Sequence, residues 1–183
     1  MLLNIEQISS ENLNDFYRID NSFKVSSVIE LSMVQGEIQY EVKEVAESWE
    51  KKYDEIRDFD PASVIDSETA VIFLAYIEDE IAGKIVLKKH WNNFAHIEDI
   101  AVDRSFRRQG IGKQLLHRAI RWAREKNFPG ISLETQDVNV GACRLYESCG
   151  FHIGGFDKSL YKAIDKSKDE VAIYWYLIFQ TRN

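Results

Sequence analysis

Residues 96–126 read HIEDIAVDRSFRRQGIGKQLLHRAIRWAREK, and this stretch decides the fold. The apolar, β-branched run at 97–102 predicts a mostly buried strand. From Ile111 onward apolar residues recur at three- and four-residue steps with Arg and Lys between them, which predicts an amphipathic helix packed on a sheet. The turn between them, 107–113, combines two glycines with three cationic side chains. Because the first turn of a helix has unpaired N–H groups, this turn is typical of a phosphate site.

Two better-known phosphate loops do not fit the spacing of this turn. A P-loop needs a glycine where Arg107 stands and a Ser or Thr where Gln114 stands. A dinucleotide-binding fingerprint needs a third glycine at the position of Leu115. A plain strand-to-helix turn with a solvated basic rim remains as the alternative without a ligand.

Length and composition predict one domain spanning residues 1–183. The chain is 45% hydrophobic and 29% charged, which is ordinary for a globular protein. Neither an export signal nor a membrane span is visible. Cys143 and Cys149 fall six residues apart on one expected helix, where a disulfide is unfavourable, so we expect free thiols and a cytoplasmic protein.

The net charge of −7 argues against a general nucleic-acid binder, which would carry an excess of basic residues. Residues 37–69 contain eleven acidic and four basic residues, so this segment carries the whole net charge. We call it the acidic insert and expect it near the site of a cationic substrate, although a solvated acidic face is the commoner meaning of such a run.

The rest of the chain predicts an α/β protein in the α+β sense, a central mixed sheet flanked by helices. The expected elements are a strand at 4–8, a helix capped by Ser9 or Ser10, a hairpin of 23–34 and 38–45, a helix at 46–57, a hairpin of 70–77 and 81–88, the central strand and helix, a strand at 131–135, a helix from 139 to 150, and strands at 156–164 and 171–179. The long helical crossover makes the strands at 97–102 and 131–135 parallel neighbours.

Two motifs together resemble the GNAT family of N-acetyltransferases. The first is Arg107-x-x-Gly110-x-Gly112, and the second is Asn139-x-x-Ala142-x-x-x-Tyr146-x-x-x-Gly150-Phe151. The resemblance implies the GNAT fold and an acetyl-CoA site, with backbone N–H groups of Ile100 and Val102 on the pantetheine arm. Its residues would be Ile100, Ala101, Val102, Arg107, Arg108, Gln109, Gly110, Ile111, Gly112, Lys113, Asn139, Ala142 and Tyr146. Without the resemblance, Asn139 could be a helix cap and Tyr146 a core aromatic.

A narrower resemblance involves three further segments, at 91–102 (WNNFAHIEDIAV), 133–137 (LETQD) and 174–179 (YWYLIF). They look like those of the streptothricin acetyltransferases, which acetylate the β-lysine amine of that cationic antibiotic. The resemblance implies an antibiotic-resistance enzyme acting on a small cationic amine. Protein N-terminal or lysine acetylation, and a non-catalytic acetyl-CoA-binding module, remain as alternatives.

Acetyl transfer to an amine requires a neutral nucleophile, and an amine with a pKa of ~10.4 is about one part in a thousand neutral near neutral pH. Glu134 and Glu98 are the candidate bases, one on each central strand, with Glu134 slightly preferred because it matches the base position of the ribosomal-protein branch of the family. The resemblance directs Tyr146 at the sulfur, where its hydroxyl would stabilise or protonate the leaving thiolate.

No metal site or covalent intermediate is expected, because the four histidines are scattered without ligand spacing and no Ser/His/Asp arrangement is supported by a motif. The expected partners are acetyl-CoA and a small cationic amine, with neither nucleic acid nor a membrane. The chain is expected to be a monomer or a homodimer.

Overall fold

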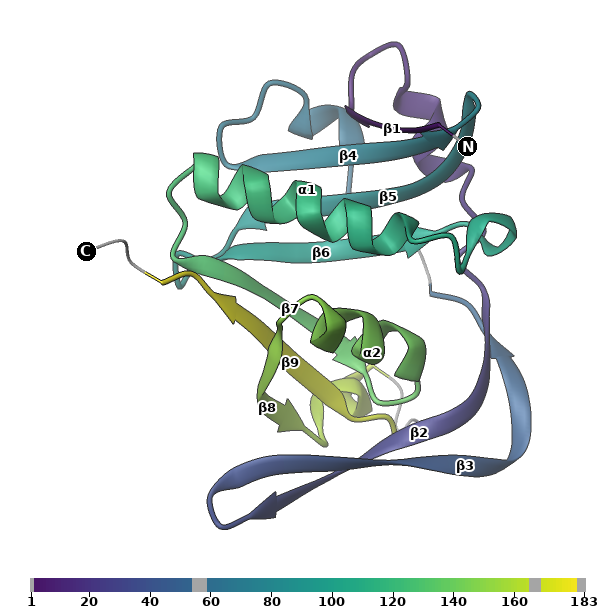
Figure 1. Ribbon diagram of the computed structural model, residues 1–183, viewed down its shortest axis with the longest axis vertical. Coiled ribbons are helices and arrows are strands. Elements are labelled where there is room, and N and C mark those ends of the chain that lie inside the picture. The colour runs from purple at the N-terminus through teal and green to yellow at the C-terminus, as the bar shows by residue number, and fades with distance from the viewer. Residues whose placement is uncertain (1, 54–58, 165–168, 181–183) are drawn as a thin grey trace. The chain divides into compact units, whose positions relative to one another are not determined.

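The computed structural model of the chain describes residues 2–53, 59–164 and 169–180 (Figure 1). By its internal contacts the chain divides into two compact units. Unit 1 comprises Met1–Ser22, Lys52–Ile131 and Ile178–Asn183, and unit 2 comprises Phe23–Lys51 and Ser132–Leu177. Both contribute strands to a mixed sheet of seven.

Unit 1 is an antiparallel sheet in the order β1-β4-β5-β6. Its strands are β1 (Leu3–Gln7), β4 (Ala70–Ile77), β5 (Glu80–Lys89) and β6 (Ala95–Val102). The β4–β5 hairpin was predicted correctly, with a tight turn in which Glu78 (φ 48°) and Asp79 (φ 69°) are left-handed. Central strands β4 and β5 are almost wholly buried because both faces of this sheet are covered.

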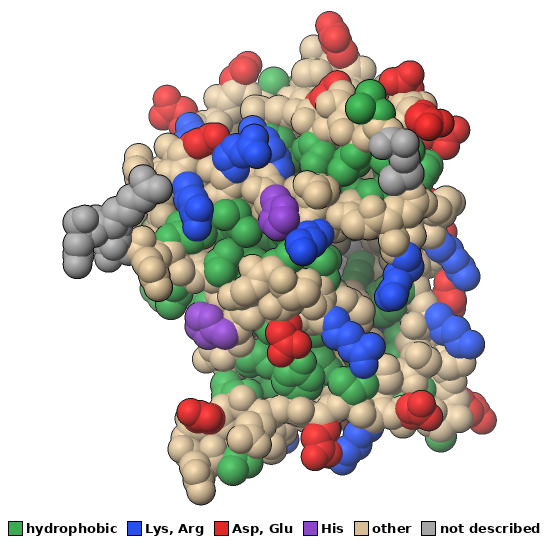
Figure 2. Space-filling view, viewed as in Figure 1, with side chains coloured by type: hydrophobic (Ala, Val, Ile, Leu, Met, Phe, Trp, Pro, Cys, Tyr) green, Lys and Arg blue, Asp and Glu red, His purple; other side chains and the backbone are tan. Residues whose placement is uncertain are grey.

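Helix α1 (Ile111–Glu125) covers one face of the unit 1 sheet (Figure 1), as its apolar stripe predicted. Its buried side chains are Ile111, Leu115, Leu116, Ala119, Trp122 and Ala123. Close packing depends on Gly83 of β5, where an added Cβ would lie 2.8 Å from the Ala101 carbonyl oxygen and 3.2 Å from Leu115. Figure 2 shows Lys and Arg side chains gathered over the outer surface of α1.

A second apolar cluster includes Ile8, Phe16, Val64, Ile72 and Leu74. It packs the 3-10 helices η1 (Leu13–Tyr17) and η2 (Pro61–Val64) with β4. The predicted helix cap at Ser9 or Ser10 was wrong. The N-cap residue of this short helix is Asn12, whose side chain accepts from the Ser9 N–H at 2.8 Å and so holds the preceding turn.

Unit 2 holds the strands β7 (Gly130–Gln136), β9 (Ala172–Ile178) and β8 (His152–Asp157), in the order β7-β9-β8. The terminal residues of β7 and β9 belong to unit 1. Helix α2 (Val140–Ser148) follows β7 and closes at Gly150, which is left-handed as a glycine C-cap requires. Unit 2 also contains a long two-stranded hairpin of β2 (Phe23–Val34) and β3 (Glu37–Lys51).

The predicted helix at 46–57 was wrong over its first part. β3 continues to Lys51 because its residues pair with β2 as far as Phe23↔Lys51, and this ladder outweighs local helix propensity. Residues 54–58 lie outside the described part. The predicted strand at 156–164 was wrong over most of its length, since β8 begins at His152 and ends at Asp157, and the 3-10 helix η4 (Leu160–Ala163) follows.

Candidate active site

The predicted phosphate turn opens α1 with a glycine in the left-handed region. Gly110 is the N-cap at φ 82°, and its carbonyl accepts the bond from the Gln114 N–H at 3.1 Å. No side chain caps this end, and a Cβ added at Gly110 would meet nothing within 4 Å. An uncapped first turn beside open space suits the anionic pyrophosphate of acetyl-CoA.

Arg107 fixes the path of the chain into this turn. Its guanidinium donates to three backbone carbonyl oxygens, those of Val102 at 3.0 Å, Ser22 at 2.6 Å and Asp20 at 3.4 Å. The Asp103 carboxylate accepts from the Asp20 N–H at 2.8 Å and strengthens the same junction. These bonds tie the turn to the 20–22 segment, so Arg107 shapes the backbone of the phosphate turn.

Glu98 lies at a bulge in β6, because Ile97 pairs with Leu87 and Asp99 pairs with Val86. Its carboxylate accepts from Lys88 Nζ at 2.9 Å and lies 3.9 Å from His96 Nε2. Burial lowers the pKa of His96 to about 4, so this ring is neutral at pH 7. The Glu98 carboxylate is therefore paired with a lysine.

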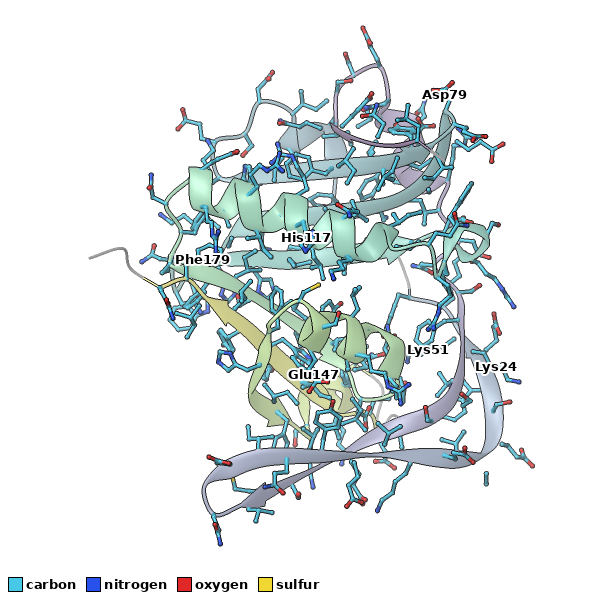
Figure 3. The ribbon with its side chains drawn as sticks, viewed as in Figure 1. Lys24, Lys51, Asp79, His117, Glu147 and Phe179 are labelled. Atoms are coloured by element: carbon cyan, nitrogen blue, oxygen red, sulfur yellow. The ribbon has the colours of Figure 1, made fainter. Side chains whose placement is uncertain are left out.

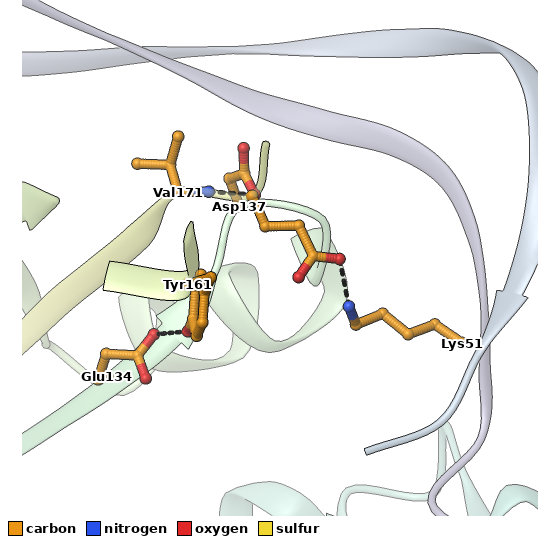
Figure 4. Close-up of polar contacts among 6 residues, drawn as sticks. Lys51, Glu134, Asp137, Tyr161 and Val171 are labelled. Atoms are coloured by element: carbon orange, nitrogen blue, oxygen red, sulfur yellow. Dashed lines mark hydrogen bonds and ion pairs between the residues drawn. The ribbon is translucent and has the colours of Figure 1, made fainter. Parts of the chain in front are cut away.

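Glu134 has a different environment on β7. Its carboxylate accepts a hydrogen bond from the Tyr161 hydroxyl on η4, and no other hydrogen bond to this carboxylate occurs among the described residues (Figure 4). Burial raises the pKa of Glu134, while the bond from Tyr161 acts in the opposite direction. A carboxylate with a raised pKa and one oxygen without a hydrogen bond is suited to accept a proton.

A second polar group in unit 2 surrounds Asp137, directly after β7 (Figure 4). Its carboxylate accepts from the Val171 N–H at 3.0 Å, and burial, reinforced by the charge of Glu170, raises its pKa. Glu170 forms a close ion pair with Lys51 at the end of β3. The Asp137 carbonyl accepts from the Ile29 N–H of β2 at 2.9 Å, so these contacts fasten the hairpin to the rest of unit 2.

The hairpin has a further attachment on α2, where the Tyr40 hydroxyl donates to Glu147 at 2.9 Å. Figure 3 labels Lys51 and Glu147, the partners of Glu170 and Tyr40 in these two side-chain attachments. The described first half of the acidic insert, Glu37–Lys51, is a strand whose residues are largely exposed.

Helix α2 carries the second motif. The Asn139 side chain accepts from the Ala142 N–H at 3.1 Å and caps the helix. Tyr146 is only 4% exposed, and its ring lies 6.1 Å from Phe151 and 6.0 Å from Trp175. The motif therefore has a structural role at both positions, whatever each residue adds in the presence of a substrate.

The two cysteines are free thiols, as predicted. Cys143 is fully buried on α2, and burial raises its pKa to about 12, so it is an uncharged thiol at neutral pH. Among the described residues, no cluster of three or more His, Cys, Asp or Glu side chains is placed to hold a metal ion. Within the same residues, no helix is long and apolar enough to span a membrane.

The expected site residues divide between the units. Unit 1 holds Glu98, Ile100, Ala101, Val102, Arg107, Arg108, Gln109, Gly110, Ile111, Gly112 and Lys113, and unit 2 holds Glu134, Asn139, Ala142 and Tyr146. Sequence reasoning missed Tyr161, Lys51 and Glu170. Tyr161 lies 27 residues from Glu134 and Glu170 lies 119 residues from Lys51, so no local pattern joins either pair.

Comparison with known proteins identifies the family of the chain. The acetyltransferase (GNAT) family matches residues 31–151. Streptothricin acetyltransferase A of Bacillus subtilis is 36% identical over 175 residues, covering 96% of this chain and 99% of that protein. A provisionally named streptothricin acetyltransferase from Bacillus anthracis, solved with acetyl coenzyme A, is 46% identical with a TM-score of 0.90, covering 97% of this chain and 100% of that one.

Nourseothricin acetyltransferase has the same fold, with a TM-score of 0.80 at 24% identity, covering 97% of this chain and 99% of that one. The mixed sheet with its two helices is the fold of the GNAT family, as predicted. The chain belongs to the GNAT family and is an acetyl-CoA-dependent N-acetyltransferase.

Proposed function

We propose that the enzyme transfers the acetyl group of acetyl-CoA to a primary amine of a small cationic substrate, namely the β-lysine moiety of streptothricin, and so confers resistance to this antibiotic. The observation that carries the proposal is the similarity to streptothricin acetyltransferase A over almost the whole length of both chains. Because this similarity includes the β2–β3 hairpin and the last two strands, it extends beyond the acetyl-CoA motifs.

In the reaction the amine nitrogen forms a bond to the thioester carbonyl carbon, and the carbon–sulfur bond then breaks. One proton leaves the nitrogen, and the departing thiolate of CoA takes up a proton. Bringing an amine of pKa ~10.4 to its neutral form near neutral pH costs about 4 kcal/mol. A base with a raised pKa reduces the mismatch with the amine.

Glu134 is our proposed base, acting directly or through a water molecule. Its partner is a hydroxyl, and burial raises its pKa. The Glu98 carboxylate, by contrast, forms an ion pair with Lys88, so one of its oxygens is already occupied by a cation. This difference in partners favours Glu134 as the base.

The acetyl-CoA site in this proposal consists of the residues assigned above. The N–H groups at the start of α1, with Arg108 and Lys113 beside them, meet the pyrophosphate, and Arg107 acts through the backbone it holds. The β6 backbone at Ile100 and Val102, with Asn139, meets the pantetheine arm. Tyr146 supplies a hydroxyl to the leaving thiolate.

The acidic insert is proposed to attract the cation. On β3, residues Glu41, Glu44 and Glu47 are exposed, which leaves their charge free to act over distance. Its members Asp54 and Asp58 lie outside the described residues. The two free thiols suit a reducing compartment, and we place the enzyme in the cytoplasm.

The test is release of free CoA from acetyl-CoA with a panel of streptothricin, an aminoglycoside, a polyamine and a peptide with a free N-terminus. The proposal expects the highest kcat/KM with streptothricin. Preference for the peptide would instead identify a protein N-terminal acetyltransferase. Acetyl-CoA binding without turnover on any amine would identify a binding module.

A further inference from the structure

Glu134 is the one residue of β7, a strand described in full, that is not buried. Its neighbours Leu133 and Thr135 are 1% and 8% exposed, so the strand itself is fixed in the core. The glutamate side chain has three rotatable bonds, and burial of the backbone alone does not determine where its carboxylate lies. A base must be held in place by something beyond its own strand.

Tyr161 provides that restraint. It lies on η4, between β8 and β9, and is 9% exposed, so its ring is held by packing. Its hydroxyl donates to Oε1 of Glu134 (Figure 4). A hydroxyl bound to a carboxylate is a charge-assisted bond, roughly twice as strong as a neutral one. It occupies one carboxylate oxygen, and Oε2 has no hydrogen bond to any described residue.

The other titratable groups near this carboxylate differ from Tyr161. Burial raises the pKa of Tyr174 on β9, and the charges of Asp157 and Glu134 raise it further. Tyr174 therefore lies in the field of Glu134, but no hydrogen bond joins the two side chains. No cation pairs with Glu134 among the described residues, in contrast to Glu98 with Lys88.

We propose that Tyr161 is a positioning residue of the acetyl-transfer reaction, which holds the Glu134 carboxylate by one oxygen and leaves the other free to take the proton of the amine. This inference rests on the proposed function of Glu134 as the base. It adds the segment between β8 and β9, which carries no recognisable motif, to the machinery of the reaction. A tyrosine with a purely structural role would make the same hydrogen bond, but removal of its hydroxyl would leave proton transfer unchanged.

The test compares Tyr161→Phe with the matched variant Tyr174→Phe. Each removes one hydroxyl near the same carboxylate, but only Tyr161 donates to it. Loss of a donor to the ionised form favours the protonated form, so the pKa of Glu134 rises. The acid limb of the kcat/KM profile with streptothricin should move up by about one pH unit in Tyr161→Phe. The plateau value of kcat/KM in Tyr161→Phe should fall roughly tenfold. Tyr174→Phe should keep the wild-type profile.

A second readout needs no substrate. Carbon-13 NMR of labelled glutamate carboxyls, with Glu134→Gln to assign the signal, reports the pKa of Glu134 directly. An unchanged pKa and pH profile in a folded Tyr161→Phe protein would overturn the inference. A raised pKa with an unchanged rate profile would retain the contact but remove Glu134 as the base, which overturns both the inference and that part of the proposed function. If the wild-type enzyme had no activity on streptothricin but the pKa of Glu134 rose in Tyr161→Phe, only the proposed substrate would be overturned.

Discussion

The phosphate turn of unit 1 and the polar cluster of unit 2 are built in opposite ways. The turn is a single contiguous segment in which backbone geometry matters most, with Gly110 left-handed and Arg107 bound to three carbonyls. The polar contacts of unit 2 instead join side chains from separate segments, Glu134 on β7 with Tyr161 on η4, and Lys51 on β3 with Glu170. A contiguous backbone site leaves a motif in the sequence, whereas a side-chain cluster does not. Changes in the turn should therefore affect acetyl-CoA binding, and changes at Glu134 and Tyr161 should affect turnover.

The largest expected effect is at Tyr146. Tyr146→Phe keeps the ring that packs against Phe151 and Trp175 but removes the hydroxyl. Turnover should fall by roughly ten- to ten-thousand-fold, because a donor to the leaving thiolate is lost, with little change in acetyl-CoA affinity. Stopped-flow or steady-state release of CoA measures this fall. Near wild-type turnover would reduce Tyr146 to a packing residue.

The variants Glu134→Gln and its control Glu98→Gln show which of the two candidate glutamates acts as the base. Loss of a general base costs about 10²- to 10⁴-fold in kcat, which we expect only for Glu134. Glu98→Gln should change kcat by less than about tenfold, because the carboxylate it removes is paired with Lys88. The reverse ranking of kcat in the two variants would move the base to β6.

The turn itself is tested by Gly112→Val, which places a branched side chain on the first turn of α1. We expect the acetyl-CoA dissociation constant to rise by about tenfold or more in a folded protein, because phosphate loses access to the N–H groups. Titration calorimetry measures this constant, and circular dichroism checks the fold. Unchanged affinity would exclude the phosphate role of this turn.

The smallest expected effect concerns the acidic insert. Replacing Glu41, Glu44 and Glu47 with Gln should lower kcat/KM for streptothricin a few-fold at low salt. It should also flatten the decline with added salt, since the Debye length shrinks from ~10 Å at 0.1 M to ~3 Å at 1 M. The matched control neutralises three exposed acids of unit 1, Glu78, Asp79 and Glu80. Parallel salt curves for wild type and the hairpin variant would mean that the hairpin is only a solvated face.

The sequence predicted the elements whose signals are local. The β4–β5 hairpin follows from two apolar runs around an acidic turn, and α1 follows from its apolar stripe after two glycines. The first helix was misplaced because the sequence analysis assigned its cap to Ser9 or Ser10, whereas the N-cap residue is Asn12. Helix α2 began one residue after the expected asparagine, as a cap requires.

The failures came where distant pairing overrides local preference. Residues from 46 onward contain Ala, Glu and Lys, which favour a helix, yet pairing with β2 keeps them in a strand as far as Lys51. The end of β8 at Asp157 was not predicted from the sequence either. The contact of Tyr161 could not be predicted, because its partner Glu134 lies on another strand. The candidate catalytic glutamate was thus visible in the sequence, and the residue that holds it was not.

The central claim is that the enzyme acetylates the β-lysine amine of streptothricin, and the most direct test is the chemical identity of the product. Purified enzyme would be incubated with acetyl-CoA and streptothricin, and the product examined by mass spectrometry and two-dimensional NMR. We predict a mass increase of one acetyl group, with the new amide on a nitrogen of the β-lysine moiety. An unmodified antibiotic, or an acetyl group elsewhere on the molecule, would contradict the account.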